Sequence, residues 1–407
     1  MKIEFSIYIL YVLSAMISLF FSLSNNQYLG GELKFFVKTI SDIDIVLVSL
    51  LNVLILSFGY FFYKFSCRKK FKFKDYRLEI KESKLDCFII IILFVQIVFC
   101  YTTGVGVVGS NKTSPISFIF SILKLDTFFY VYYLYKRSVN DKFGKKLIVS
   151  IVLFSFLRLI QGWTGFILFL FFIEIYVRLN KNKNKNKNKN KNKNKKALFI
   201  IPIFVILIGG GIYSQMYTFK NNIRGNKITE TIGYVDGVKH LTSRLTMNYV
   251  SIGAYQNSDK IIKLYNANNP ELKEVSAFFR PFVPSFLMDK NFAVLNYYVM
   301  NSYYPDLNRG TSSDFGLPMY VYILFKANFI SFTFFMMLSL ILFTISKFFF
   351  DLMSTVGVKF DLLYFFIIFK YIQTASLEIV FGYGFISNIF IFLALFLLGI
   401  FRFTKKI

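Results

Sequence analysis

Five arginines, one histidine and one aspartate are the side chains of this sequence that best suit a chemical role. The arginines are Arg158, Arg224, Arg244, Arg280 and Arg309. A guanidinium binds a phosphate or a diphosphate through two parallel hydrogen bonds. His240 is the only histidine of the chain, and it and Asp314 are candidate general bases. Together these residue types predict an anion-binding site at which a hydroxyl group is deprotonated.

Three of the arginines have a distinctive local sequence, although an arginine in a loop is most often a solvated surface charge. Arg244 opens a segment with a helical pattern of apolar residues, and Arg280 lies between phenylalanines. Arg309 begins a turn of small residues that ends at Asp314. Such a turn can present backbone N–H groups to an anion.

The base could be a histidine or a carboxylate. His240 stands four residues before Arg244, so the two would share one face of a helix, and its ordinary pKa suits base catalysis near neutral pH. A lone histidine is, however, more often a structural group, and Asp306 and Asp314 are rival bases. No cofactor and no metal is expected, since residues 213–315 hold one His and no Cys and the chain has no nucleotide-binding glycine motif.

These residues belong to a chain that is otherwise apolar. It has 407 residues, of which 55% are hydrophobic, and a mean hydropathy of +0.53, as is typical of a polytopic membrane protein. Apolar runs long enough to cross a bilayer core of about 30 Å predict an all-α fold with about 10 transmembrane helices, in the range 10–12. The ten predicted spans are Phe5–Leu23, Ile43–Phe62, Cys87–Tyr101, Ser117–Tyr135, Leu147–Ile160, Trp163–Val177, Ala197–Ile212, Phe329–Ile345, Asp361–Ile379 and Phe385–Phe401.

Positive charge predicts the topology. The net charge is +26, and Lys64–Lys84 and Arg178–Lys196 together hold 19 of the 48 basic residues. Basic clusters beside apolar runs mark cytoplasmic loops and contact anionic headgroups, so this charge does not indicate a nucleic-acid partner. The alternation of basic and non-basic loops predicts that both termini are cytoplasmic and that the long polar segment is extracytoplasmic.

Three regions follow from this pattern. Residues 1–212 form a bundle of about seven helices, residues 213–315 form a large extracytoplasmic loop, and residues 316–407 form the C-terminal helices. Within this last region, Gly382–Gly384 is expected to be a short outer turn. The Lys-Asn repeat within residues 180–196 is expected to be disordered because it has no apolar face. In the large loop, His240–Tyr255 predicts an amphipathic helix, and Phe315–Phe325 predicts an interfacial or re-entrant segment.

Charged residues within the predicted spans are costly and tend to face the protein interior or a water-filled cavity. Arg158 is expected near the outer end of its span, where it either binds an anion or extends to the interface. Lys124 and Asp126 are two residues apart and do not face each other on a helix, so pairing with other spans is expected. Glu174 is expected to extend toward cytoplasmic water. Lys370 and Glu378 complete this set, with Glu378 expected near the outer surface and Lys370 deeper in the membrane.

The layout and three patches of this sequence resemble the Wzy-type O-antigen polymerases. The layout shared with the family is about ten spans with one dominant outward loop late in the chain. The patches are residues 158–165 (Arg-Leu-Ile-Gln-Gly-Trp-Thr-Gly), residues 241–245 (Leu-Thr-Ser-Arg-Leu), and the segment from Arg280-Pro281 to Phe315-Gly316. No clean copy of the Arg- and Gly-containing loop repeats described for some members is present.

The resemblance implies a membrane glycosyltransferase with a GT-C-like arrangement in the bacterial cytoplasmic (inner) membrane. Such an enzyme polymerises oligosaccharide repeat units of O-antigen or capsular polysaccharide, moving the growing chain from undecaprenyl pyrophosphate onto a new repeat unit. The implied partners are the lipid-linked glycan, the bilayer and a chain-length regulator protein. The five arginines would bind pyrophosphate, and His240 or Asp314 would act as the base.

Three other functions are alternatives to a polymerase. An O-antigen ligase of similar architecture needs nearly the same charges but moves the finished polymer to a lipid acceptor. A lipid-linked oligosaccharide flippase or transporter predicts internal repeats and short outer loops, and neither is evident. A membrane acyltransferase is expected to need a catalytic histidine near the membrane, whereas His240 lies in the long loop.

Overall fold

The computed structural model describes residues 2–28, 33, 36–71, 73, 75–107, 112, 114–185, 191–223, 232–268, 272–284, 287, 292–306 and 313–405, with backbone alone at 182–185, 191–197 and 218–223. The N-terminal part comprises α1 (Ile3–Ser24), α2 (Asp42–Arg68), β1 (Tyr76–Ile80), α3 (Glu82–Thr103), α4 (Ser117–Ile122), α5 (Asp126–Val139), α6 (Lys145–Ile160), α7 (Phe166–Lys185) and α8 (Lys191–Ile223). The middle part comprises α9 (Tyr234–Thr246), α10 (Asn248–Gln256), α11 (Ser258–Asn266), α12 (Lys273–Ser276), the 3-10 helix η2 (Ala277–Phe282), α13 (Leu295–Tyr303) and α14 (Leu317–Ala327). The C-terminal part comprises α15 (Phe329–Met353), the 3-10 turn η4 (Ser354–Val356), α16 (Asp361–Thr374), the π-helix η5 (Glu378–Ile386), α17 (Ser387–Leu397) and β2 (Phe401–Lys405).

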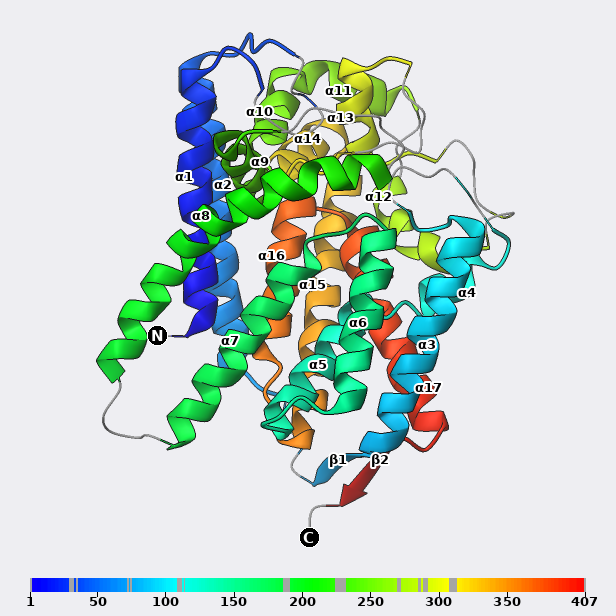
Figure 1. Cartoon of the computed structure of the whole chain (residues 1–407). Helices are drawn as coiled ribbons and strands as arrows, with labels where there is room; N and C mark the ends of the chain where they lie inside the picture. The colour runs from blue at the N-terminus through cyan, green and yellow to red at the C-terminus, as the bar shows by residue number, and fades with distance from the viewer. Residues whose placement is uncertain are drawn as a thin grey trace.

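Membrane-length helices dominate the structure (Figure 1). Among the described residues, seven segments are long and apolar enough to cross a bilayer: Ile3–Ser24, Asp42–Arg68, Glu82–Thr103, Ser117–Val139, Leu198–Tyr217, Phe329–Val356 and Glu378–Leu397. The other three predicted spans also fall on helices, namely α6, α7 and α16, but α6 has only 16 residues and α16 only 14. The protein is therefore a predominantly helical, multi-pass membrane protein.

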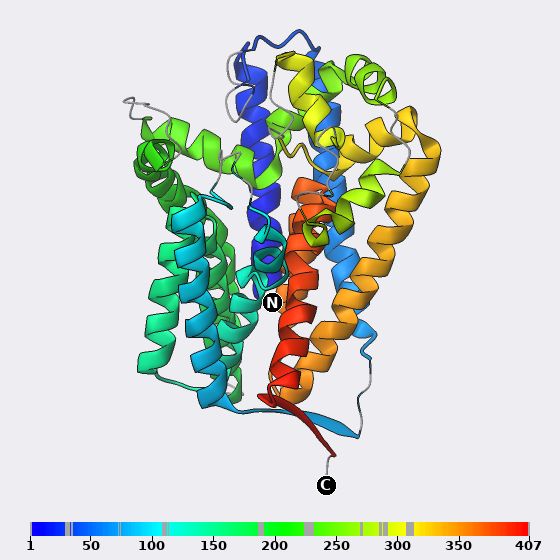
Figure 2. The same ribbon diagram turned by 90° about the vertical axis from the view of Figure 1, so that its right-hand side faces the viewer.

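The two ends of the bundle differ in structure (Figures 1 and 2). We call the end that carries β1 and β2 the strand end, and the end that carries α9 to α14 the loop end. The strands pair antiparallel, with Tyr76 opposite Lys405 and Ile80 opposite Phe401. This short strand pair is an addition to the predicted all-α fold. The pairing joins two segments that were both predicted to be cytoplasmic, and it places them at one face.

The long polar segment is folded into short helices at the loop end. α8 continues to Ile223, so the predicted boundary at residue 212 falls inside a helix. The predicted helix over His240–Tyr255 is interrupted, because Met247 adopts a left-handed backbone conformation (φ 54°) between α9 and α10. The apolar segment before the eighth predicted span forms α14, which is too short to cross a bilayer.

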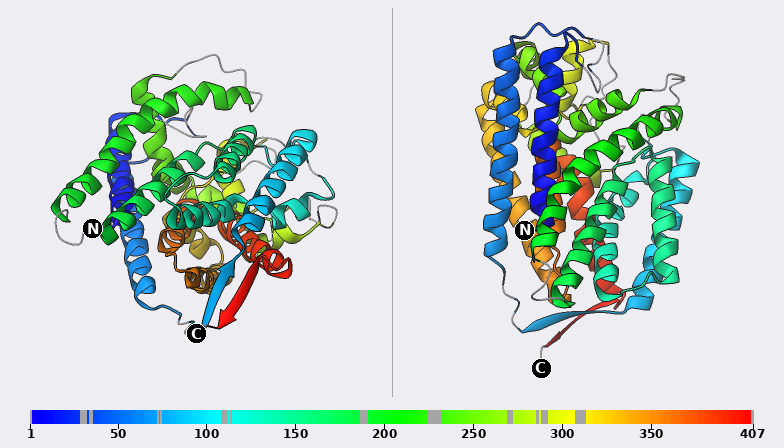
Figure 3. Two further views of the ribbon diagram at one scale, coloured as in Figure 1. Left: turned by 60° about the horizontal axis from the view of Figure 1, so that its bottom comes forward. Right: turned by 60° about the vertical axis from the view of Figure 1, so that its left-hand side comes forward.

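A close crossing of α8 and α9 fixes the first of these loop helices. α8 contains Pro202 and bends along its length (Figures 1 and 3). A Cβ atom added to Gly237 would lie 2.2 Å from the carbonyl oxygen of Gly210, and one added to Gly210 would lie 2.4 Å from a methyl group of Val238. Only glycine permits the two backbones to approach this closely, as in membrane helix pairs with small residues at the interface.

The C-terminal helices turn earlier than the sequence suggests. α16 ends at Thr374, and Ala375 adopts a left-handed conformation (φ 50°). The chain then re-enters as the π-helix η5, which runs directly into α17. The prediction that Gly382–Gly384 forms the outer turn is therefore wrong. Gly382 instead packs inside the bundle, where an added Cβ would lie 2.9 Å from Pro281 of η2.

The Lys-Asn repeat differs in part from its predicted disorder. α7 continues through Lys185 and α8 begins at Lys191, so both ends of the repeat extend neighbouring apolar helices. Lysine is a good helix former and needs no buried partner for this. Residues 186–190 lie outside the described part of the chain.

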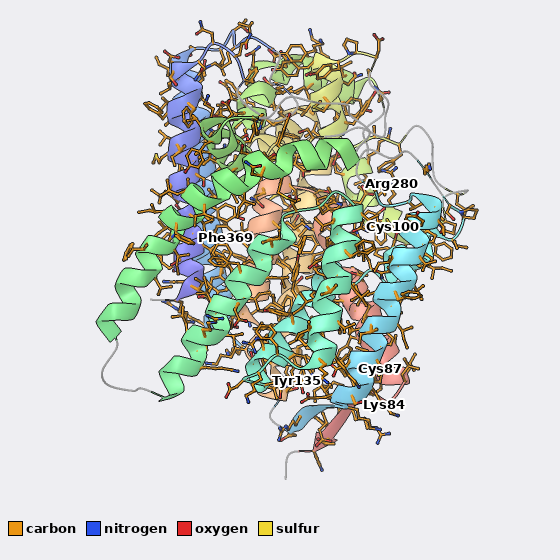
Figure 4. All side chains as sticks on the ribbon, in the orientation of Figure 1. Lys84, Cys87, Cys100, Tyr135, Arg280 and Phe369 are labelled. Atoms are coloured by element: carbon orange, nitrogen blue, oxygen red, sulfur yellow. The ribbon has the colours of Figure 1, made fainter. Side chains whose placement is uncertain are left out.

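Aromatic rings fill the centre of the bundle. Tyr11 of α1 meets Phe369 of α16 edge-on, with ring centroids 5.1 Å apart, and Phe365 lies 4.2 Å from Phe369 along the same helix. Figure 4 shows Phe369 between the two ends of the molecule. Pairs of this kind contribute about 0.5–1.5 kcal/mol beyond the area that they bury. These contacts hold α16 in a fixed position, and with it Lys370, which lies near the loop end of this helix.

Candidate functional site

A break between α4 and α5 creates the first part of the site. The helix is interrupted at Leu123–Leu125, and the carbonyl of Leu123 accepts a hydrogen bond of 2.6 Å from Nε2 of buried Gln96 on α3. Because the chain is not helical here, Lys124 Nζ lies 2.9 Å from Asp126 Oδ2. The expectation that these two side chains do not face each other is therefore wrong, since it assumed an uninterrupted helix, whereas the expected pairing with another span is confirmed for Asp126 by Arg158 of α6.

Arg158 completes the pairing of Asp126 from the last turn of α6. Its guanidinium forms an ion pair with Asp126 Oδ1 and donates a hydrogen bond of 3.0 Å to Gln161 Oε1. Arg158 is only 6% exposed and lies over the ring of Phe154, so it does not extend to the interface. Its Nε–H group is buried and has no hydrogen-bond partner among the described residues.

Lys370 brings a further cation to the same place. It lies one turn before the end of α16, and its electrostatic neighbours are Asp126, Lys124, Arg158 and Asp314. Among the described residues, its ammonium group forms no hydrogen bond and no ion pair. A partly buried ammonium beside two other cations is unfavourable unless an anion accompanies it.

Asp314 connects the long loop to this cluster. It precedes α14 and accepts a hydrogen bond of 3.0 Å from Nδ2 of Asn296 on α13. Asn296 is itself buried, and its Oδ1 has no hydrogen-bond partner within the described part of the chain. Asp314 therefore lies within electrostatic range of Lys370 and has the amide of Asn296 as one of its partners.

A second ion pair borders the cluster. Arg280 Nη1 of η2 lies 3.8 Å from Oε2 of Glu378, at the start of η5. Tyr383 of η5 joins the two groups, because Lys124 lies 5.2 Å from the centre of its ring and Glu378 and Arg280 are its electrostatic neighbours. Arg280 lies at the loop end of the molecule (Figure 4). Within the described part of the chain, the cluster thus contains one more cation than carboxylates. Its cations are Lys124, Arg158, Lys370 and Arg280, and its carboxylates are Asp126, Asp314 and Glu378.

The other predicted site residues lie elsewhere. His240 on α9 stacks against Tyr213 and Tyr217 of α8, with ring centroids 5.7 Å and 5.5 Å apart. Arg244 lies one turn further along α9, next to Leu245, whose carbonyl accepts a hydrogen bond from Gln373 of α16. Arg224 and Arg309 lie outside the described residues. The structure therefore gathers Arg158, Arg280 and Asp314, and it places His240 against the aromatic rings of α8.

A buried carboxyl group that the sequence analysis did not single out holds the loop helices together. Glu274 of α12 is 2% exposed, and its Oε1 accepts a hydrogen bond of 2.7 Å from the backbone N–H of Leu295. Its other oxygen meets the hydroxyl of Tyr320, and Tyr265 is a further hydrogen-bond partner. Burial raises the pKa of Glu274 from 4.5 to about 8 and outweighs these hydrogen bonds.

Glu174 lies at the strand end and does not extend to cytoplasmic water as predicted. Glu174 of α7 receives two hydrogen bonds from Arg137 of α5, of 3.0 Å and 2.9 Å, and one from Arg178. Its side chain is only 16% exposed. Rather than extending to water, it joins two helices, because Arg137 lies at the same level of the bundle.

Sequence reasoning found the charges of the site but not their grouping. Lys124, Asp126, Lys370 and Glu378 stood out as charges within apolar spans, which is the usual signal of a functional position. Gln96 and Tyr383 carried no such signal. In the part of the chain that the structure describes, no group of three His, Cys, Asp or Glu side chains is placed to hold a metal ion.

The fold and the cluster define a multi-pass membrane protein with a buried, cation-rich polar site near one end of its bundle. Comparisons with protein-family models, with curated protein sequences and with solved structures find no match to this chain.

Proposed function

We propose that this protein is a membrane glycosyltransferase that polymerises undecaprenyl-pyrophosphate-linked repeat units of a bacterial O-antigen or capsular polysaccharide. In this proposal the loop end faces outward, the strand end is cytoplasmic, and α6, α7 and α16 cross the membrane with the seven longer segments. At the strand end, β1 from a basic loop pairs with β2 from the basic C-terminal segment. Basic segments beside membrane helices are typical of the cytoplasmic side, so this pairing supports the orientation.

One observation carries the proposal. The cluster contains two cationic groups with unused hydrogen-bond donors, the Nε–H of Arg158 and the ammonium of Lys370. Both lie among other charges in an apolar surrounding, where an unpaired donor is costly. A diphosphate supplies the missing negative charge and acceptors. Such an anion is the leaving group when a lipid-linked glycan donates its sugar chain.

The cluster also contains the groups that the transfer needs. The acceptor hydroxyl gives its proton to the carboxylate of Asp314, and its oxygen forms a bond to the anomeric carbon of the growing chain. The bond between that carbon and the diphosphate oxygen breaks, and the electron pair leaves with the carrier diphosphate. Arg158 and Lys370 stabilise the charge that develops on it. Asp314 is the better placed of the two predicted bases, since His240 stacks on the rings of α8.

Complementation of a deletion strain tests the proposal. The surface polysaccharide of cells carrying the wild-type gene should run as a ladder of many repeat units. Lys370→Gln and Asp314→Asn should each reduce it to single units, with a loss of polymerisation on the order of 10²-fold for a removed charge-stabilising or proton-accepting group. Lys326→Gln removes an exposed charge on α14 at the same end and should leave the ladder unchanged.

The same gels separate polymerisation from its alternatives. A strain without any surface units, rather than one with single units, would indicate a ligase or a flippase and would contradict the proposal. Protein levels in the membrane fraction control for misfolding. An intact ladder in Lys370→Gln cells would show that this cation binds no leaving group.

A further inference from the structure

A cavity lies at the strand end, far from the cluster described above. It has a volume of about 600 Å³ and is bounded by the first turns of α3, the end of α5, the α5–α6 connection and the start of α6. Its lining residues are Asp86, Lys136, Asn140, Asp141, Lys142, Gly144, Lys145, Lys146 and Leu147. Figure 4 shows Lys84 and Cys87 of α3 and Tyr135 of α5 at this end of the molecule.

Both carboxylates of the cavity are already paired. Asp86 lies 3.2 Å from the ammonium of Lys136, which also contacts Glu82 at 2.8 Å. Asp141 pairs with Lys181 of α7 at 2.8 Å. Lys136 is the only lysine of the lining that is nine-tenths buried, and its charge is compensated by Asp86 and Glu82.

Three other lysines of the lining have no carboxylate partner among the described residues. Lys146 donates to the neutral Ser83 Oγ at 3.0 Å and approaches Cys87 Sγ at 3.8 Å. Lys142 and Lys145 are exposed and form no ion pair within the described chain. The cavity therefore presents three uncompensated positive charges around one concave space.

The surface next to the cavity is apolar. α3 and α6 pack side by side. Their exposed residues above the cavity include Ile91 and Phe94 on α3 and Ile148 and Val152 on α6, each about half exposed or more. α6 begins at Lys145, so Ile148 follows the basic residues within one turn. A ligand here meets cations at its head and hydrocarbon-facing helices beside it.

We propose that this cavity binds the phosphate group of an anionic glycerophospholipid, whose acyl chains lie along α3 and α6. The three lysines neutralise the phosphate, and the position of the cavity where apolar helices end matches the depth of a headgroup. Inorganic phosphate has the same charged group but lacks the acyl chains, so the two sources can be distinguished.

Alkylation of Cys87 provides the readout. Cys87 is exposed and lies at the edge of the cavity, whereas Cys100 is buried. The full chain carrying Cys67→Ser and Cys100→Ser is reconstituted in vesicles of phosphatidylcholine, with or without phosphatidylglycerol, and treated with an uncharged maleimide. Phosphatidylglycerol should slow alkylation several-fold. Inorganic phosphate added to the phosphatidylcholine vesicles should not slow it.

The triple variant Lys142→Gln, Lys145→Gln, Lys146→Gln should lose this protection. At roughly fivefold in affinity for each lysine near an anionic surface, its phosphatidylglycerol affinity should fall roughly a hundredfold. Rates with and without phosphatidylglycerol are compared within each variant, because Lys146 lies beside the reactive thiol. A thermal midpoint in phosphatidylcholine equal to that of the parent shows that the variant is folded.

A matched variant tests whether any basic segment at this end would give the same result. Arg68→Gln, Lys69→Gln, Lys70→Gln removes three exposed charges at the end of α2, outside the cavity, and should keep full protection. Equal loss in both triple variants, equal alkylation rates in both vesicle types, or protection by inorganic phosphate alone would each overturn the proposal.

Discussion

The carboxyl group of Glu274 should make the loop end sensitive to alkaline pH. Its pKa is raised from 4.5 to about 8 because it is buried, so the folded protein holds a proton that the unfolded chain loses above pH 4.5. The stabilisation from this proton is complete below pH 4.5 and is lost as the pH rises through about 8. At about 1.4 kcal/mol for each tenfold change in proton affinity, the full effect is on the order of 5 kcal/mol.

Glu274→Gln should remove this sensitivity while keeping the contacts. The amide oxygen can accept from the N–H of Leu295, and the amide nitrogen can donate to the hydroxyl oxygens of Tyr320 and Tyr265, which are the hydrogen-bond partners of the carboxyl group in the wild type. Between pH 6 and pH 9 most of the remaining effect, on the order of 2–3 kcal/mol, should be lost in the wild type and not in the variant.

Thermal unfolding midpoints of the purified protein, measured in one detergent from pH 6 to pH 9, provide the assay. Glu79→Gln, at an exposed carboxylate on β1, should follow the wild type across this range. Parallel curves for wild type and Glu274→Gln would refute the reasoning, since they would mean that Glu274 is already ionised in the folded protein at pH 6.

Three further tests probe the packing and the charge pairing. Gly237→Ala places a Cβ 2.2 Å from the carbonyl oxygen of Gly210 and should lower the free energy of unfolding by about 1–3 kcal/mol in a denaturation assay. Arg158→Gln should cost about 3–5 kcal/mol, and adding Asp126→Asn should recover part of this loss, giving a coupling of about 1–3 kcal/mol in a double-mutant cycle. Gln96→Leu leaves the Leu123 carbonyl unsatisfied and should cost about 1–3 kcal/mol, seen as a lower unfolding midpoint.

Each of these has an outcome that would contradict it. Gly233→Ala is the control for the first, because an added Cβ there meets no atom nearer than 4.0 Å; equal stability of the two alanine variants would exclude the close crossing. Additive effects of Arg158→Gln and Asp126→Asn would show that the two side chains do not interact. An unchanged midpoint for Gln96→Leu would mean that the break before α5 needs no side-chain donor.

The sequence was sufficient to place most of the helices because apolar run length is a local property. The first, second and third predicted spans each coincide with a helix to within a few residues at most ends. The apolar segment before α15 was also found, as α14. These elements follow from composition over some twenty residues, which is the scale at which a bilayer selects for hydrophobicity.

Features that depend on distant partners could not be predicted in this way. The break at Leu123–Leu125 contains neither glycine nor proline, and its stability depends on Gln96 from another helix. β1 and β2 are separated by most of the chain, and neither is distinctive alone. Arg158 combines a predictable and an unpredictable property. Its capacity to bind an anion and its approximate depth followed from the sequence, but its ion pair with Asp126 depends on the break at Leu123–Leu125.

The antiparallel pair of β1 and β2 has a consequence for biosynthesis. β2 follows α17 in the chain, so its partner β1 stays an unpaired edge while α3 and the helices after it are being inserted. The sheet can therefore assemble only after the helices between its two strands have been synthesised. Removing β2 should leave insertion intact but yield a protein in which the chain between α2 and α3 is no longer tied to the end of α17.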